Sequence, residues 1–141
     1  MKQLHFNTKE PSILRSDLVP ASTMYCVPFI LQVLTGSPDL SAALGDQPVS
    51  GVYMPTLVKT LEESGIKLRR IELSNKPTVQ ALASKLDHLG NHFKTYLIAV
   101  RKHVLLLSNS RVTDNGNPNS VSVHSYSMAK YKVDQLWEVW K

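Results

Sequence analysis

One cysteine and a distant histidine and acid are the residues of this chain whose types and spacing could do chemistry. Cys26 is the only cysteine among 141 residues, and it begins the most apolar helical segment. The unpaired backbone N–H groups and the dipole of a helix N-terminus stabilise a thiolate. His103 opens a predicted strand far downstream, and Asp114 stands on the strand after it. A thiolate paired with an imidazole is a nucleophile, and an acid can orient the imidazole.

His103 begins a predicted hairpin, and two residues of its second strand could contact the imidazole: the acid Asp114 and the amide Asn115. If the turn is centred on Asn109, Asn115 lies directly opposite His103. If the turn is centred between Asn109 and Ser110, Asp114 is instead its diagonal neighbour on the same face, about 7–8 Å away and within side-chain reach. Taken singly, a helix cysteine is often a small core residue and a strand histidine a structural one. Their order along the chain with a hairpin acid favours a site.

The helix that would carry the cysteine is predicted over residues 26–36. Its residues are almost all apolar, so we expect it to be buried on all sides. Pro28 falls in the first turn, where its missing N–H has no helical partner, and Gly36 ends the helix. The candidate nucleophile is therefore predicted to stand on a rigid central element.

Alternating and helical patterns divide the rest of the chain. Helices are predicted from Met54 to Gly65 and from Pro77 to Gly90, with Leu89 on the apolar face of the second. Residues 66–73 predict a short strand. Its apolar residues stand at even positions (66 and 68) before Arg69-Arg70 and at odd positions (71 and 73) after it, and this change of parity suggests a bulge. Further strands are predicted over 95–101, 103–108, 111–114 and 133–140, and loops over 37–50 and 116–122.

These segments resemble a known superfamily. The pieces that carry the resemblance are Cys26-Val27 with Thr35-Gly36, the segment 95–107, and Val112-Thr113-Asp114. They are similar to the papain-like cysteine peptidases, in particular to the small papain-like proteins encoded by bacteriophages. The resemblance implies an α+β fold in which a central buried helix packs on an antiparallel β-sheet. It implies one papain-like domain over 1–141, with an N-terminal extension (1–21), a helical part (22–90) and the sheet (91–141).

The resemblance also implies a catalytic triad of Cys26, His103 and Asp114, with Asn115 as the alternative orienting residue. Its oxyanion would be held by the Cys26 N–H and a second donor. Ser22 and Thr23 are the side chains upstream of the cysteine that could support it, or else a backbone N–H or the more distant Asn7.

Two functions are compatible with this resemblance. The first is a thiol hydrolase or acyltransferase that acts on amide or peptide bonds, with a protein or peptide as substrate. The second is a non-catalytic phage protein that keeps the fold to bind a host protein or to serve in the virion. Reactivity of the lone thiol would separate them, because only the first needs a thiolate.

Composition limits the other function classes. The net charge is +5 with a pI near 9.4, but the basic residues are scattered in pairs, so nucleic acid is not an expected partner. His88 and His92 have the spacing of a zinc pair, but Gly90 lies between them at a predicted helix end and no Cys or carboxylate completes a site, so we expect neither metal nor cofactor.

The first residues of the sequence contain no apolar run of signal-peptide length, and no stretch of the chain approaches the length of a membrane helix. A lone cysteine cannot form an internal disulfide. We therefore expect a protein of the infected host's cytoplasm or of the virion, without a membrane partner. The oligomeric state has no signal in the sequence.

Overall fold

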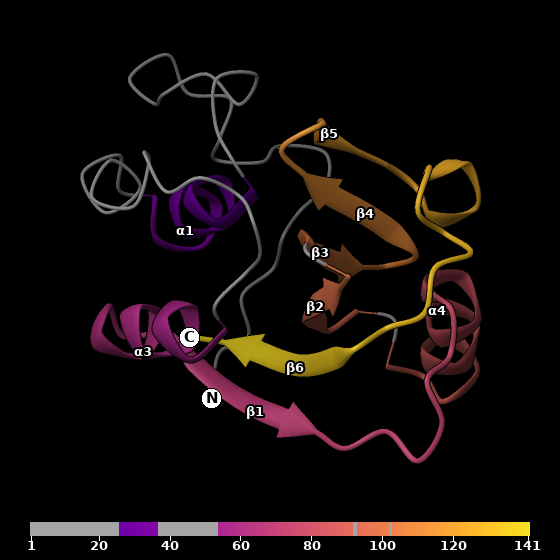
Figure 1. Ribbon diagram of the computed structural model, residues 1–141, viewed down its shortest axis with the longest axis horizontal. Coiled ribbons are helices and arrows are strands. Elements are labelled where there is room, and N and C mark those ends of the chain that lie inside the picture. Colours follow the sequence, from indigo (N-terminus) through magenta and orange to yellow (C-terminus); the bar gives the residue numbers. More distant parts are fainter. Residues whose placement is uncertain (1–25, 37–53, 92, 102) are drawn as a thin grey trace.

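The computed structural model describes residues 26–36, 54–91, 93–101 and 103–141, without the side chains of 26–28. Over this part of the chain it has an α+β fold, as expected, with three α-helices and a six-stranded antiparallel sheet (Figure 1). The helices are α1 (Cys26–Thr35), α3 (Met54–Glu63) and α4 (Val79–His88). The strands are β1 (Lys67–Ile71), β2 (Thr95–Val100), β3 (His103–Ser108), β4 (Arg111–Asp114), β5 (Asn117–Ser122) and β6 (Gln135–Trp140), and a short 3-10 helix, η3, spans Val123–Ser125.

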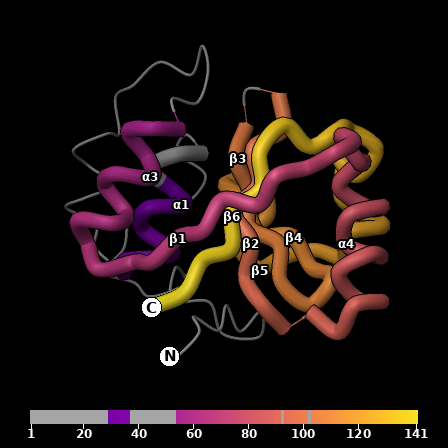
Figure 2. The backbone as a smooth tube through the Cα atoms, turned by 90° about the horizontal axis from the view of Figure 1, so that it is seen from below, coloured from indigo at the N-terminus to yellow at the C-terminus, as the bar shows by residue number. Residues whose placement is uncertain are grey.

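The sheet separates two layers of helices. Its strand order is β1-β6-β2-β3-β4-β5, so the last strand of the chain lies between the first two. Helices α1 and α3 cover one face, and α4 covers the other (Figure 2). Each face therefore has its own hydrophobic core, and alternate residues of the central strands point into one or the other.

The first core joins α1 and α3 to one face of the sheet. All side chains of 29–34 are buried, so the prediction of a helix without a solvent face is confirmed for this stretch. The residues that β2 and β3 contribute to this core alternate along the strands and are Leu97, Ala99, Val104 and Leu106, and β6 contributes Val139. This burial fixes the helix that begins at Cys26 against the centre of the sheet.

The second core lies under α4 on the opposite face. Thr78 caps this helix, since its hydroxyl accepts a hydrogen bond from the Ala81 N–H at 3.2 Å. The prediction for Leu89 is wrong, because this residue is the C-cap and is 59% exposed. The helix ends one residue too early for the apolar face to include it. The main members of the second core are Val79, Leu82, Ile98, Val100, Leu105, Leu107, Val112, Val123, Tyr126 and Leu136.

The bulge predicted in β1 is absent. Pairing with β6 runs without interruption from Lys67 opposite Trp140 to Ile71 opposite Leu136. Leu68 packs against the first core and Ile71 against the second. The change of parity in the sequence arises because both faces of the sheet are covered, so that one strand supplies apolar residues to each.

Residues 117–122, predicted as a loop, form the edge strand β5. It pairs with β4, with an irregular register between Val112 and Asp114. Its residues are poor strand formers, and Pro118 is tolerated because an edge strand need not donate on both sides. Pairing with β4, rather than local preference, makes this segment a strand.

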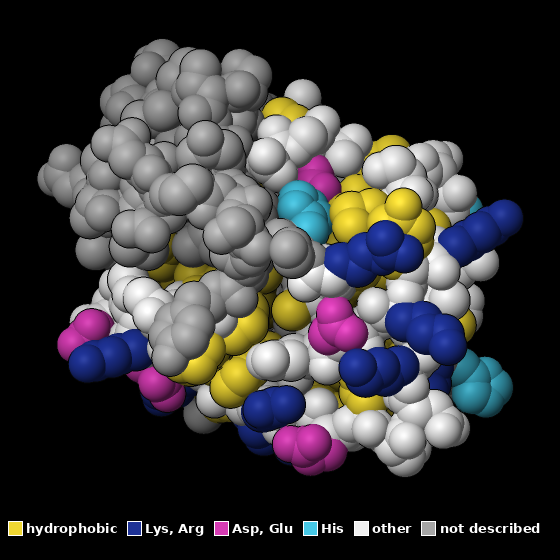
Figure 3. Space-filling view, in the orientation of Figure 1, with side chains coloured by type: hydrophobic (Ala, Val, Ile, Leu, Met, Phe, Trp, Pro, Cys, Tyr) yellow, Lys and Arg dark blue, Asp and Glu magenta, His cyan; other side chains and the backbone are white. Residues whose placement is uncertain are grey.

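The described helices are each too short or too polar to cross a membrane. On the face shown in Figure 3, Lys and Arg side chains are spread among acidic and uncharged ones instead of forming one continuous patch. This distribution agrees with the scattered basic pairs of the sequence.

Candidate functional site

The hairpin between β3 and β4 sets the geometry of the candidate site. Its strands pair from Leu106 opposite Thr113 to Ser108 opposite Arg111. The two residues of the turn have positive φ angles, 54° at Asn109 and 60° at Ser110. Positive φ at both central residues is the pattern of a type I′ turn, whose twist matches that of the strands. The turn is therefore centred between Asn109 and Ser110, the second of the two predicted alternatives.

This register places Asp114, and not Asn115, on the face of His103. The His103 Nε2 lies 2.8 Å from the Asp114 Oδ2. Asn115 lies in the short turn between β4 and β5. Of the residues predicted for the site, the structure thus brings His103 and Asp114 into direct contact.

Asp114 is a buried acceptor for four donors. Its Oδ1 accepts from the Gly116 N–H at 3.0 Å and from the Asn117 Nδ2 at 2.9 Å. Its Oδ2 accepts from the Tyr126 hydroxyl at 2.7 Å and lies at hydrogen-bond distance from His103. The residue is only 4% exposed. Bonds on both oxygens fix the carboxylate and, through it, the imidazole.

The electrostatics of Asp114 follow from these contacts. Burial by itself would raise the pKa of the carboxyl group, but hydrogen bonds from His103, Tyr126 and Asn117 lower it more. The pKa of Asp114 therefore lies below its ordinary value of 3.8. The group remains a carboxylate at neutral pH and can stabilise a protonated imidazole.

This lowered pKa predicts a pH dependence of stability. A carboxyl group whose pKa is lower in the folded protein contributes stability above its ordinary pKa, and this contribution is lost as the pH falls through the lowered value. We expect the free energy of unfolding to fall more steeply below the ordinary pKa of 3.8 in the wild type than in Asp114→Asn. Urea unfolding from neutral pH to about pH 2 measures both slopes. Equal slopes would contradict the pairing of this carboxylate.

His103 stands at one end of the sheet. It is the first residue of β3, pairs with Val100, and keeps 21% of its side chain exposed. Val100 and Leu105 belong to the second core, so strand alternation gives His103 the face opposite to α1. A group on α1 can reach the imidazole only around this end of the sheet.

Cys26 is the first residue of α1, as the sequence predicts. Its side chain lies outside the described residues, and so do Ser22, Thr23 and Asn7. The distance from the Cys26 sulfur to the imidazole, which we expect to be about 4 Å or less, stays a prediction.

Three donors to Asp114 were not predicted from the sequence. Gly116 had a local signal, because an Asp-Asn-Gly sequence favours a turn in which the Asp side chain accepts the N–H two residues on. Asn117 directly follows this turn. Tyr126 had no local signal, since it is brought to Asp114 by η3 and by packing in the second core.

The described residues contain no group of three or more His, Cys, Asp or Glu side chains that could hold a metal ion. His88 is exposed at the end of α4, and His92 lies outside the described part of the chain.

Comparisons with known proteins give no match: no family model, no curated protein and no solved structure corresponds to this chain.

Proposed function

We propose that this chain is a papain-like thiol hydrolase or acyltransferase that acts on amide or peptide bonds through Cys26, His103 and Asp114. The observation that carries the proposal is the 2.8 Å contact between the imidazole of His103 and the buried carboxylate of Asp114. A carboxylate that is fixed by several donors and bonded to one imidazole nitrogen is the arrangement that orients a general base.

The chemistry assigns one role to each atom. The Cys26 thiolate attacks the carbonyl carbon, and the Cys26 N–H helps to hold the oxyanion. Because Nε2 of His103 is bonded to Asp114, Nδ1 exchanges the proton. It takes the proton of the thiol, gives it to the leaving amine, and then accepts one from the water or amine that releases the acyl group.

Two further features support this proposal. Cys26 is the first residue of α1, and the described side chains of this helix are largely buried. A thiolate at this position would be stabilised by the helix N-terminus. The motifs around Cys26, His103 and Asp114 resemble those of phage papain-like proteins. The corresponding substrate is a protein or peptide, and the chain itself would be located in the cytoplasm of the infected bacterial host or carried in the virion.

A non-catalytic binding protein with the same fold is the second candidate. It is favoured by the position of His103, whose strand register gives it the face opposite to α1. In this case the bond between His103 and Asp114 fixes the hairpin, and the chain binds a host protein or another virion component.

Alkylation of the lone thiol by iodoacetamide tests the proposal. With only one cysteine in the chain, the reaction reports on Cys26 alone. We expect the wild type to react at about pH 6 nearly as fast as at about pH 9. At about pH 6, His103→Ala should react on the order of 100-fold more slowly than the wild type. The exposed His124 provides a matched control, and His124→Ala should behave like the wild type.

An ordinary thiol profile in the wild type, unchanged by His103→Ala, would contradict the catalytic assignment and leave the binding protein. Circular dichroism of each variant establishes that the fold is retained.

A further inference from the structure

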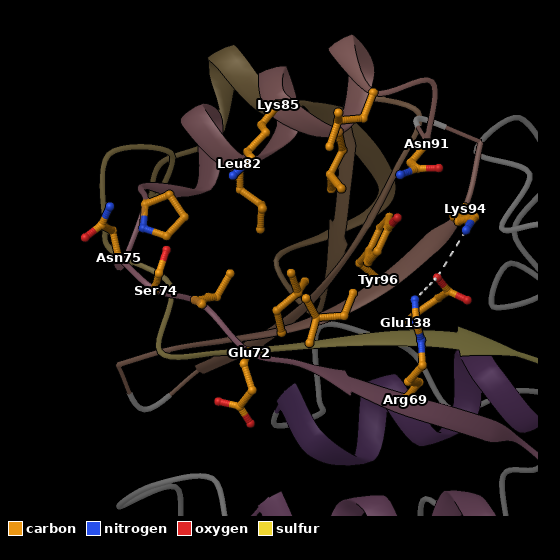
Figure 4. A pocket seen from close by; sticks show the side chains of 16 residues that line it. Arg69, Glu72, Ser74, Asn75, Leu82, Lys85, Asn91, Lys94, Tyr96 and Glu138 are labelled. Carbon is orange, nitrogen blue, oxygen red and sulfur yellow. Dashed lines mark hydrogen bonds and ion pairs between the residues drawn. The ribbon is translucent and has the colours of Figure 1, made fainter.

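A cavity of about 430 Å³ lies between α4 and the strands β1, β6 and β2 (Figure 4). Its middle is apolar and is formed by Ile71, Leu73, Leu82, Leu86 and Leu136. This volume lies within the range of roughly 300–1,000 Å³ that is usual for small-molecule sites. The cavity is therefore large enough for an organic ligand.

The cavity is separate from the candidate triad. Tyr96, which lines the cavity, pairs with Leu107, whereas His103 pairs with Val100 at the other end of β2. Four residues of a strand span about 13 Å. A ligand in the cavity would therefore not touch the imidazole.

The Tyr96 side chain gives the cavity a polar group that the fold does not use. This residue is 2% exposed, and no hydrogen bond of its hydroxyl is found among the described residues. In Figure 4 the hydroxyl is directed to the side of the cavity where Asn91 and Lys94 stand. Burial and then the charge of Glu138 raise the pKa of Tyr96 to about 12. The hydroxyl thus stays protonated at neutral pH and can donate to a ligand.

Cations predominate at the rim. Arg69, Lys85 and Lys94 line the cavity together with two acids, Glu72 and Glu138. Glu138 already bonds to Arg69 at 3.2 Å and to Lys94 at 3.3 Å. Glu72 points away from the cavity in Figure 4. Lys85 projects from α4 over the cavity, and no ion pair is found for it within the described part of the chain.

We propose that this cavity binds a small amphipathic acid, whose aromatic or branched aliphatic body fills the apolar middle and whose anionic group meets Lys85, with the Tyr96 hydroxyl as a further donor. Lys85 is an exposed cation that can pair with an anionic group of the ligand. An apolar body would cover the leucine side chains of the cavity, which a fully polar ligand would not do. The proposal is independent of the thiol chemistry.

Fluorescence titration with 1-anilinonaphthalene-8-sulfonate, an aromatic anion, tests this site. We expect one saturable site per chain, and Lys85→Gln should weaken binding about 3–10-fold by removing one charge contact. The uncharged N-phenyl-1-naphthylamine should bind Lys85→Gln and wild type alike. Lys130→Gln removes an exposed lysine away from the cavity and should change neither affinity. Tyr96→Phe should weaken only the anion, and Cys26→Ala should leave both unchanged.

Several results would overturn the proposal. Leu82→Trp should block both probes by filling the cavity, and undiminished binding in this variant, if its thermal unfolding remains cooperative, places the probes elsewhere. If Leu82→Trp does not fold, Lys85→Gln and Tyr96→Phe still test the site. Wild-type affinity for the anion in both of these variants would exclude it. Displacement of the probe by an uncharged leucine-containing peptide but not by 4-phenylbutyrate would indicate a protein partner instead.

Discussion

Asp114→Ala is expected to lower the free energy of unfolding by about 2–4 kcal/mol. In the same variant, the reactivity of Cys26 should fall to that of an ordinary thiol. The substitution leaves Gly116, Asn117 and Tyr126 without the acceptor they now use. Tyr126 is buried, and a buried donor that loses its acceptor costs free energy in addition to the lost bond. Urea unfolding measures the first effect, and iodoacetamide alkylation at about pH 6 measures the second.

Two matched substitutions separate these effects. Tyr126→Phe removes one hydroxyl bond to the carboxylate and should cost about 1 kcal/mol while the His103 contact remains. Asn115→Ala changes the neighbouring residue and should leave thiol reactivity unchanged, because the observed register gives Asp114 the face of His103. Loss of reactivity in Asn115→Ala but not in Asp114→Ala would mean that the amide orients the imidazole.

Leu31→Ala is expected to cost about 2–5 kcal/mol by opening a cavity in the first core. The leucine is fully buried in the middle of α1. Cys26→Ala, at the start of the same helix, should change the free energy of unfolding by only about 1–2 kcal/mol, because it removes one small side chain. Thermal or urea unfolding of both variants gives the comparison.

The same pair of variants separates fold from chemistry. If a biological effect of the protein survives in folded Cys26→Ala, the enzyme proposal is wrong and the binding protein remains. If Cys26→Ala unfolds the protein as severely as Leu31→Ala, Cys26 is a core residue and not a nucleophile.

Local sequence patterns determined the elements that position the site. A helix without a polar face can be stable only when it is buried, so the burial of 29–34 followed from composition alone. The predicted strands from 95 to 114 match β2, β3 and β4 closely, because apolar runs bounded by turn residues specify strands without reference to distant contacts.

Other features were decided only by tertiary structure. Residues 117–122 have little strand preference and become β5 through pairing with β4. The parity change in β1 reflects two covered faces of the sheet, which a pattern within one strand cannot distinguish from a bulge. In both cases the information lies in residues far away in the chain.

The candidate site shows the same division. The sequence by itself determined that His103 would have either Asp114 or Asn115 as its neighbour, since both follow from the alternation of a hairpin. The choice of Asp114 depended on the φ angles of Asn109 and Ser110, because a shift of pairing register by one residue moves every side chain to the other face. The bond from Tyr126 to Asp114, and the face on which His103 lies, depended on packing between segments that no local pattern connects.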